Sequence, residues 1–513
     1  MSSPSQSVQH FDVLIIGAGI SGIGAAYELK QQCPDMSFAV LEGLESFGGT
    51  WLWHKYPGVR SDSDLYTFGY RFKPWLGAPI ASAQEILKYL GEVISENDLD
   101  RHIHYQHRVV TAAWNSDAAL WTLDVICGGD ATPAQFTCNF LWMCQGYYRH
   151  AKGHTPAWPD MDRFSGPVIH PQTWPEDLSY KDKKVVVIGS GATAATVVPA
   201  IAEECAHVTL LQRSPSYFSP GRNRHWLADV LRELSVDEAW IHEIVRRRIV
   251  ADQAKFLRHA IDEPEAATDE LLKGVRAYLP DDVVDVHFTP SYRPWRQRIA
   301  VAPDGDLFKC ITSGKASIVT DHIERFVEQG VRLKSGQTLD ADIIVTATGF
   351  DICVLGDIRF VIDGEVLNFA ETITYRGLMF TGVPNMAWIF GYFRAASWTL
   401  RVDLVADFIC RLLRHMKSRG ARTVEVALRP EDMGMKLLPW IDDEVFNPGY
   451  LMRGMHLLPK RGDKSEWAHS QDYWWERDVL PLVDLDDPVF VYGGAMCSAE
   501  RPDNGTAAVR EIA

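Results

Sequence analysis

The sequence predicts an α/β protein with two sheet-based domains, because one strand–turn–helix–strand pattern occurs twice. Residues 11–16 (FDVLII) form an apolar run that suits a strand buried on both faces, a helical pattern follows over 20–31, and another apolar run covers 37–42. The same order recurs over 184–212, beginning with KVVVI. Each first strand ends in a glycine-rich turn that opens the helix, which is typical of Rossmann-like dinucleotide-binding domains. We therefore predict two such domains and two nucleotide sites.

Composition and charge narrow the classes of function. The 513 residues carry a formal net charge of −16, which argues against broad nucleic-acid binding. We expect no transmembrane segment and no signal peptide. The 9 cysteines are scattered without a CxxC pair, which favours a reduced, cytoplasmic protein without a metal site. The basic run 246–248 is interpreted as a solvated helix face. The sequence leaves the oligomeric state open and is compatible with a monomer.

Breaks in the pattern predict how the chain is divided. Segments with Gly and Pro near 146–160 and 328–340 are expected to cross between domains. From 341 the run ADIIVTATG has the form of a buried strand, which we interpret as the chain re-entering the first domain. The expected units are the first dinucleotide domain at 8–150, the second at 151–335 with a helical insertion at about 222–285, the remainder of the first at 336–480, and a less ordered tail at 481–513.

The first turn, GAGISG, has the residues that a pyrophosphate site needs. Gly17 permits the tight turn, Gly19 lets the pyrophosphate approach the backbone, and Gly22 lets helix and strand pack closely. Ser21 lies in the same turn, where free N–H groups at the start of the helix can bind phosphate. Glu42 ends the next strand, and its carboxylate can accept hydrogen bonds from a ribose diol but repels a 2′-phosphate.

The second turn differs from the first at the acidic position. Its expected cofactor-binding residues are Gly189, Ser190, Gly191, Ala192, Thr193 and Ala194. Arg213 and Ser214 stand where an acid would indicate NAD. A guanidinium there matches a 2′-phosphate, so this site is predicted to prefer NADPH. The most economical assignment is FAD in the first site and NADPH in the second.

A flavoprotein reduced by NADPH passes its electrons mostly to a disulfide, to another carrier or to dioxygen. A disulfide reductase needs a redox-active cysteine pair beside the flavin, and the first turn has none near it. Dioxygen chemistry is therefore the favoured interpretation. An NADPH oxidase or sensor flavoprotein that does not oxygenate a substrate stays open as an alternative.

The segment just before the second turn resembles a known family. Residues 164–175 read FSGPVIHPQTWP, which matches the FxGxxxHxxxWP fingerprint of type I Baeyer–Villiger monooxygenases. Related sulfide- and amine-oxygenating flavin monooxygenases, the alternative enzyme class, typically end this motif without Trp-Pro. We expect His170 and Trp174 to anchor the connection between the domains rather than to transfer protons.

Other segments agree with this resemblance. The stretches 48–51 (GGTW) and 56–64 (YPGVRSDSD) resemble the flavin-contacting region of the family, and 347–349 (ATG) resembles its second FAD motif. GGTW, 294–298 (PWRQR) and 396–399 (ASWT) are most similar to the ethionamide-activating subgroup. By this resemblance the FAD contacts are expected to include Thr50, Trp51, Trp53, Arg60, Ser61, Asp62, Val109, Thr348 and Gly349.

The resemblance also implies a reaction and two catalytic groups. Arg298 aligns with the catalytic arginine of the family, and Asp62 with the carboxylate that holds this arginine in place. In the family, reduced flavin and dioxygen form a flavin C4a-peroxide, which converts a ketone to an ester or lactone, with sulfoxidation as an expected side activity. The implied small-molecule partners are therefore a ketone or sulfide and dioxygen. Many members have Lys before the catalytic arginine, but here Gln297 makes the NADPH preference depend more on Arg213.

Overall fold

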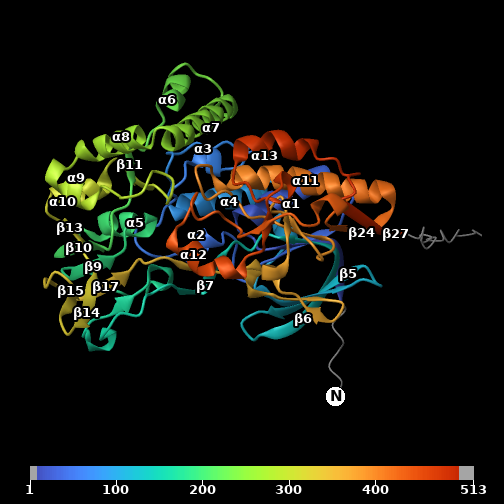
Figure 1. The fold of residues 1–513 in the computed structure, drawn as a ribbon, viewed down its shortest axis with the longest axis horizontal. Coiled ribbons are helices and arrows are strands. Elements are labelled where there is room, and N and C mark those ends of the chain that lie inside the picture. The colour runs from blue at the N-terminus through green and yellow to red at the C-terminus, as the bar shows by residue number, and fades with distance from the viewer. Residues whose placement is uncertain (1–7, 496–513) are drawn as a thin grey trace, which may run out of the picture.

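Two β-sheets organise residues 8–495, the part of the chain that the computed structural model describes (Figure 1). The first sheet has nine strands, and its centre is parallel because β1 pairs in parallel with both of its neighbours. In spatial order its strands are β20 (Glu365–Val366), β19 (Arg359–Ile362), β4 (His107–Asn115), β5 (Leu120–Cys127), β6 (Thr132–Met143), β1 (Gln9–Ile16), β2 (Phe38–Leu41) and β3 (Ile103–His104), and β23 (Met386–Trp388) pairs with β6.

The second sheet is parallel throughout. Its five strands, in spatial order, are β13 (Ala316–Thr320), β10 (His207–Gln212), β9 (Lys184–Ile188), β17 (Ile343–Thr346) and β8 (Val168–Ile169). The apolar run of β9 is buried from Val185 to Ile188, as expected for a central strand covered on both faces. The helix α5 (Ala192–Ile201) follows β9 just as α1 (Ile20–Gln32) follows β1, so both predicted strand–turn–helix units are present.

Helices cover one face of the first sheet. Buried residues of α1, α4 (Ala83–Glu96) and α11 (Trp398–Arg419) form one core with the sheet, and Ser82 and Glu85 begin α4 with reciprocal capping hydrogen bonds. The other helices outside the insertion are α2 (Thr50–Trp53), α3 (Leu65–Phe68), α10 (Asp306–Thr312), α12 (Gly449–Gly454) and α13 (Tyr473–Val479).

Short pairs of strands complete the fold. They are β7 (Tyr148–Gly153) with β18 (Phe350–Ile352), β11 (Phe218–Gly221) with β12 (Ala300–Pro303), β21 (Thr374–Tyr375) with β22 (Met379–Phe380), β25 (Leu437–Leu438) with β26 (Arg461–Gly462), and the antiparallel set β14 (Ile323–Val327), β15 (Gly330–Leu333) and β16 (Thr338–Asp340).

The interpretation of the run after 341 as re-entry into the first domain is wrong. β17 lies within this run and pairs with β9 and β8, so it belongs to the second sheet. The chain returns to the first sheet only at β19, which pairs with β4. The boundary at 335/336 therefore lies too early, because an apolar strand buried on both faces has the same sequence pattern in either sheet.

The predicted helical region contains α6 (Trp226–Glu233), α7 (Glu238–Asp262), α8 (Pro264–Arg276) and α9 (Asp281–His287). Its assignment as a whole to the second domain is wrong. Ile241 and Val245 of α7 belong to the core that contains α1 and α11, whereas Leu272 and Val275 of α8 belong to the core of the second sheet. The insertion therefore spans both halves of the molecule, as its course along the upper edge of Figure 1 shows.

Two smaller expectations also fail. The expectation of a less ordered tail is wrong for residues 481–495, because β27 (Phe490–Ala495) pairs antiparallel with β24 (Ala421–Val426); the rest of the predicted tail, 496–513, lies outside the described part. The basic run is not wholly solvated, because Arg246 is buried and its Nη2 donates to Asp403 Oδ2 at 2.8 Å. Among residues 8–495, the structure contains no helix with the length and apolar character needed to cross a membrane.

Candidate active site

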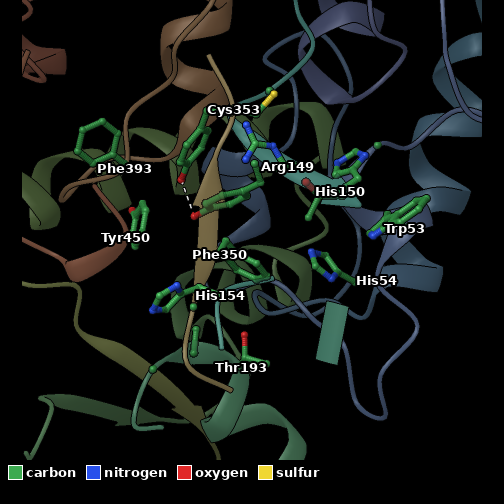
Figure 2. Close-up of a pocket in the computed structure, with 18 of the residues that line it drawn as sticks. Trp53, His54, Arg149, His150, His154, Thr193, Phe350, Cys353, Phe393 and Tyr450 are labelled. Atoms are coloured by element: carbon green, nitrogen blue, oxygen red, sulfur yellow. Dashed lines mark hydrogen bonds between the residues drawn. The ribbon is translucent and has the colours of Figure 1, made fainter. Parts of the chain in front are cut away.

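One large cavity lies where the two glycine-rich turns face each other. Its volume is about 1120 Å³, which exceeds the roughly 300–1,000 Å³ of most small-ligand pockets. Residues from β1, β9 and the loops after both strands line it, so both turns open into the same space. Figure 2 shows part of its wall, with Trp53 and His54 from the first half and Thr193 from the second. The cavity is thus large enough for more than one small ligand.

The first turn has the conformation that its glycines permit. Gly17 adopts φ +102°, and its N–H donates to Leu41 O at 2.8 Å across the parallel strands. Gly19 caps α1 without a side-chain hydrogen bond, which leaves the first N–H groups of the helix available to a ligand. A Cβ on Gly22 would lie 1.8 Å from Gly17 O, so this glycine serves helix packing, as predicted, and does not line the cavity.

Glu42 stands at the end of β2 and is fixed by the backbone. Its two carboxylate oxygens accept the N–H groups of Ala18 and Leu44 at 2.6 and 2.8 Å. Burial raises the pKa of Glu42, while these backbone donors favour its ionised form. The side chain lines the cavity beside the first turn, where each carboxylate oxygen can still accept a second hydrogen bond.

The second turn repeats this geometry at the other side of the cavity. Gly189 has φ +138°, and Gly191 caps α5 with open space where a Cβ would point. Ser190 Oγ lies 2.8 Å from Ser216 Oγ, which fixes the turn against the loop after β10. Arg213 follows β10 and is exposed at the cavity wall. A phosphate group at this turn would therefore meet free N–H groups and a guanidinium.

Arg298 lies at the junction of the two halves and is held by Asp62. Arg298 Nε donates to Asp62 Oδ2 at 2.6 Å and Nη2 donates to Oδ1 at 2.9 Å, which is a bidentate ion pair. Nη1 donates to the carbonyl of Phe393 at 3.0 Å. Burial disfavours its charge, but the Asp62 carboxylate outweighs this effect and raises the pKa of Arg298. The guanidinium is therefore a permanent, oriented positive charge in the cavity wall.

The loop that presents Phe393 is itself clamped by Gln471. Gln471 Oε1 accepts the N–H of Phe393 at 3.0 Å, and Gln471 Nε2 donates to Gly391 O at 3.0 Å. Arg401 donates to the carbonyl of Phe390 in the same loop at 2.6 Å and is ion-paired with Glu476 at 2.9 Å. Residues near the C-terminal end of the described chain thus fix a second acceptor of Arg298. The sequence carries no local pattern that indicates this contact.

Three tyrosines near Arg298 were also missed from the sequence. Tyr147 donates a hydrogen bond to Tyr148 at 2.7 Å between hydroxyl oxygens, and the ring centroid of Tyr450 lies 5.8 Å from that of Tyr148. Burial raises the pKa of all three phenols, so they remain neutral hydrogen-bond donors, although the charge of Arg298 opposes the shift. Tyr147 and Tyr148 follow the carboxyl end of β6, the sheet edge where ligands of such folds bind, which is the signal that could have found them.

The fingerprint segment contacts the second FAD motif. His170 Nε2 lies 2.9 Å from the carbonyl oxygen of Gly349, and its ring occupies the space where Gly153 would carry a Cβ. Burial lowers the pKa of His170, which keeps the imidazole neutral at physiological pH. These contacts place His170 against the two segments through which the chain passes between the main sheets, one containing Gly153 and the other Gly349, which fits an anchoring role.

Most of the residues predicted to bind cofactors line this cavity. Ser61 and Ala194 do not, because both are buried in the packing behind the wall, and the Ser61 hydroxyl donates to Ser63 O. The predicted residues that line it are Gly17, Gly19, Ser21, Glu42, Thr50, Trp51, Trp53, Arg60, Asp62, Val109, Gly189, Ser190, Gly191, Ala192, Thr193, Arg213, Ser214, Arg298, Thr348 and Gly349.

Unpaired polar atoms in the wall fit a large polar ligand. Among the described residues, Trp53 Nε1, His54 Nδ1 and Gln145 Oε1 are buried, line the cavity and have no hydrogen-bond partner. A buried polar group left unpaired costs about 1–3 kcal/mol, so such atoms indicate that a ligand supplies partners. Together with the free helix N-termini, they fit dinucleotide cofactors.

Comparisons with known proteins connect these features to a family. A model of the flavin-binding monooxygenase-like family matches residues 79–236, and a model of the NAD(P)-binding Rossmann-like domain matches residues 15–75. The FAD-containing monooxygenase EthA of Mycobacterium tuberculosis is 43% identical over 93% of this chain and 97% of its own. The probable FAD-binding monooxygenase AlmA of Acinetobacter baylyi is 42% identical over 96% and 98%.

Solved structures share the fold at lower identity. An oxidised steroid monooxygenase bound to NADP has a TM-score of 0.73 and 24% identity, covering 94% of this chain and 99% of its own. An open crystal structure of cyclohexanone monooxygenase has a TM-score of 0.71 and 22% identity, covering 95% and 100%. At these identities the likeness concerns the fold alone, and it confirms the α/β fold class predicted from the sequence.

Proposed function

Because this chain belongs to the family of FAD-containing monooxygenases, we propose that it inserts an oxygen atom next to a ketone carbonyl, giving an ester or lactone. Its cofactors are FAD and NADPH. The observation that supports ketone oxygenation most directly is the bidentate pair of Arg298 and Asp62, which presents a fixed cation to the cavity between both dinucleotide turns. Sulfoxidation is proposed as a side activity.

The two turns divide the cofactors between them. We assign FAD to the first turn, where Gly19 and the start of α1 offer N–H groups and Glu42 faces the ribose. We assign NADPH to the second turn, where Arg213 is free to pair with the 2′-phosphate. Glu42 would repel that phosphate, so the reverse assignment would bury two negative charges together.

When bound, NADPH supplies the hydride and reduced FAD supplies activated dioxygen. The residues of this chain then orient Arg298 and stabilise negative charge that develops on oxygen. Arg298 stays protonated, and its charge favours negative charge that develops on oxygen near it. Asp62 holds two of its nitrogens and the carbonyl of Phe393 holds the third, so little reorientation is needed during the reaction.

The names of structures with the same fold support a ketone substrate. One of them is a cyclohexanone monooxygenase with ε-caprolactone bound, and this lactone is cyclohexanone with one oxygen inserted beside its carbonyl. For this chain the aromatic wall of Tyr147, Tyr148 and Tyr450 beside Arg298 favours an apolar substrate whose carbonyl accepts a hydrogen bond.

Product analysis with isotopically labelled dioxygen tests this function. The purified yellow holoenzyme receives NADPH with cyclohexanone, 2-decanone or thioanisole, and the products are identified by mass spectrometry. We expect labelled ester or lactone from at least one ketone. Labelled sulfoxide with no ester from any ketone would favour the sulfide- and amine-oxygenating branch. NADPH consumption that yields only hydrogen peroxide would favour an oxidase or sensor.

A further inference from the structure

The hairpin of α6 and α7 exposes apolar side chains at the edge of the molecule, where it stands out from the body (Figure 1). Within residues 8–495, five of the fifteen large hydrophobic side chains classed as exposed lie between Trp226 and Ile244. They include Trp226 and Trp240, which are 64% and 66% exposed. Such a concentration on one projecting element marks an interaction surface rather than scattered surface residues.

The apolar residues of α6 form a stripe on its outer side. Trp226, Val230 and Leu234, the residue that caps the C-terminus of the helix, follow one another at intervals of four residues, which places them on one side of the helix. Leu227 and Leu231 on the inner side pack against the core of the first half. The outer side of α6 is therefore apolar without serving the fold.

The exposed side of α7 combines apolar and basic side chains. Ile241, Val245 and Ile249 point into the core of the first half. At 100° per residue, most of the exposed residues of α7 fall within one arc of about 100° on another side of the helix. Glu243 pairs with Arg247, and Asp252 pairs with Arg248. Asp262 is the last residue of the helix. Lys255 and Arg258 have no salt bridge within the described chain. The arc presents Trp240, Ile244, Arg247, Arg248, Lys255 and Arg258.

The basic residues of the hairpin gather on its exposed side. The hairpin from 226 to 262 carries a net charge of −1, in a protein whose net charge is −16, and four of its six basic residues lie on the exposed arc of α7. The basic residues on this arc, next to exposed tryptophan side chains, are complementary in charge to an anionic surface. A symmetric pairing of two copies through this hairpin would bring the basic residues of each arc against those of the other copy, which costs electrostatic energy.

We propose that the outer side of α6 and α7 docks the protein on the surface of an anionic lipid bilayer. Tryptophan rings settle at the level of the headgroups because they are apolar with one N–H donor, and Val230, Leu234 and Ile244 enter the acyl boundary. Arg247, Lys255 and the other basic residues meet anionic headgroups. This inference does not depend on the substrate of the enzyme.

Vesicle sedimentation with the full-length holoenzyme tests the proposal. Vesicles of phosphatidylcholine containing one-third phosphatidylglycerol are expected to carry the protein down, and vesicles of phosphatidylcholine alone at least tenfold less. The double variant Trp226→Ser/Trp240→Ser and the double variant Lys255→Gln/Arg258→Gln should each weaken binding to anionic vesicles at least tenfold. High salt should weaken binding of the wild type.

The matched control replaces an exposed apolar side chain elsewhere. Leu482 is 82% exposed and lies outside the hairpin, so Leu482→Ser should bind vesicles like the wild type. Unchanged FAD content and melting temperature of every variant establish that it folds. Equal binding of wild type and both double variants, or no binding of the wild type to either vesicle, overturns the proposal. So does a dimer in solution that the tryptophan variant dissociates while the wild type ignores vesicles.

Discussion

Replacing Arg298 with Ala should abolish most ketone oxygenation and leave the reduction of the flavin by NADPH nearly unchanged. The side chain contacts Asp62, Ser63 and the carbonyl of Phe393, and it belongs to neither dinucleotide turn. Removing it should therefore delete a charge at the proposed reaction site without deleting a proposed phosphate or ribose contact. The expected phenotype is a protein that is reduced normally and then consumes NADPH without oxygenating the ketone.

The exposure of the ion pair sets the expected magnitude. The side chains of Arg298 and Asp62 are 33% and 31% exposed to the cavity, so an effective dielectric constant near 20 applies rather than the value for a dry interior. A unit charge about 4 Å away is then stabilised by about 4 kcal/mol. Asp62 cancels part of this attraction. At about 1.4 kcal/mol per tenfold, we expect product formation to fall by about 10²- to 10³-fold.

The assay compares three rates in each variant: anaerobic flavin reduction, NADPH consumption in air and ester formation. Arg298→Lys keeps the charge but cannot donate two parallel hydrogen bonds, so its rate of ester formation should lie between those of wild type and Arg298→Ala. Asp62→Asn removes the anion that orients the guanidinium and should lower ester formation by roughly 10²-fold. Ester formation by Arg298→Ala within a factor of ten of the wild type would refute the role assigned to this residue.

Three further variants test separate parts of the argument. Arg213→Ala should raise KM for NADPH by about 10- to 100-fold with little effect on NADH, and steady-state kinetics showing an unchanged preference would contradict the phosphate assignment. Gln471→Ala should lower ester formed per NADPH consumed, with normal FAD content and flavin reduction, because Arg298 loses its ordered carbonyl partner; unchanged coupling would limit Gln471 to a structural role. Burial lowers the pKa of His242 to about 4, so the unfolded chain binds a proton there first, and folding stability falls by up to about 3 kcal/mol as pH drops from 6.5 to 4. Urea unfolding of His242→Gln should show less of this loss, whereas parallel pH profiles would exclude the contribution of His242.

The glycine-rich turns could be predicted because their chemistry is local. Gly17 and Gly189 need positive φ, and each precedes a helix whose start is part of the same short segment. The residue proposed to select the nucleotide, Glu42 or Arg213, also lies only one strand further along the chain. Short-range sequence patterns of this kind can be recognised without knowledge of the tertiary structure.

Features that depend on distant segments could not be predicted. β17 has the same apolar pattern whether it joins the first or the second sheet, and only pairing with β9 decides. Arg246 appears as part of a basic run, but its helix position puts it on the same side as Val245 and Ile249, where Asp403 neutralises it. Gln471 lies far from Arg298 in the chain, and no spacing rule connects the two.

The loop after α2 explains why both halves must meet before the site is complete. Its charges face the second half of the chain: Arg60 Nη1 donates to Asp306 Oδ2 of α10 at 2.5 Å, and Asp62 accepts from Arg298, which precedes β12. The guanidinium is thus oriented by a carboxylate from the first half while its backbone belongs to the second half. The proposed catalytic geometry therefore requires the contact between both halves around the cavity.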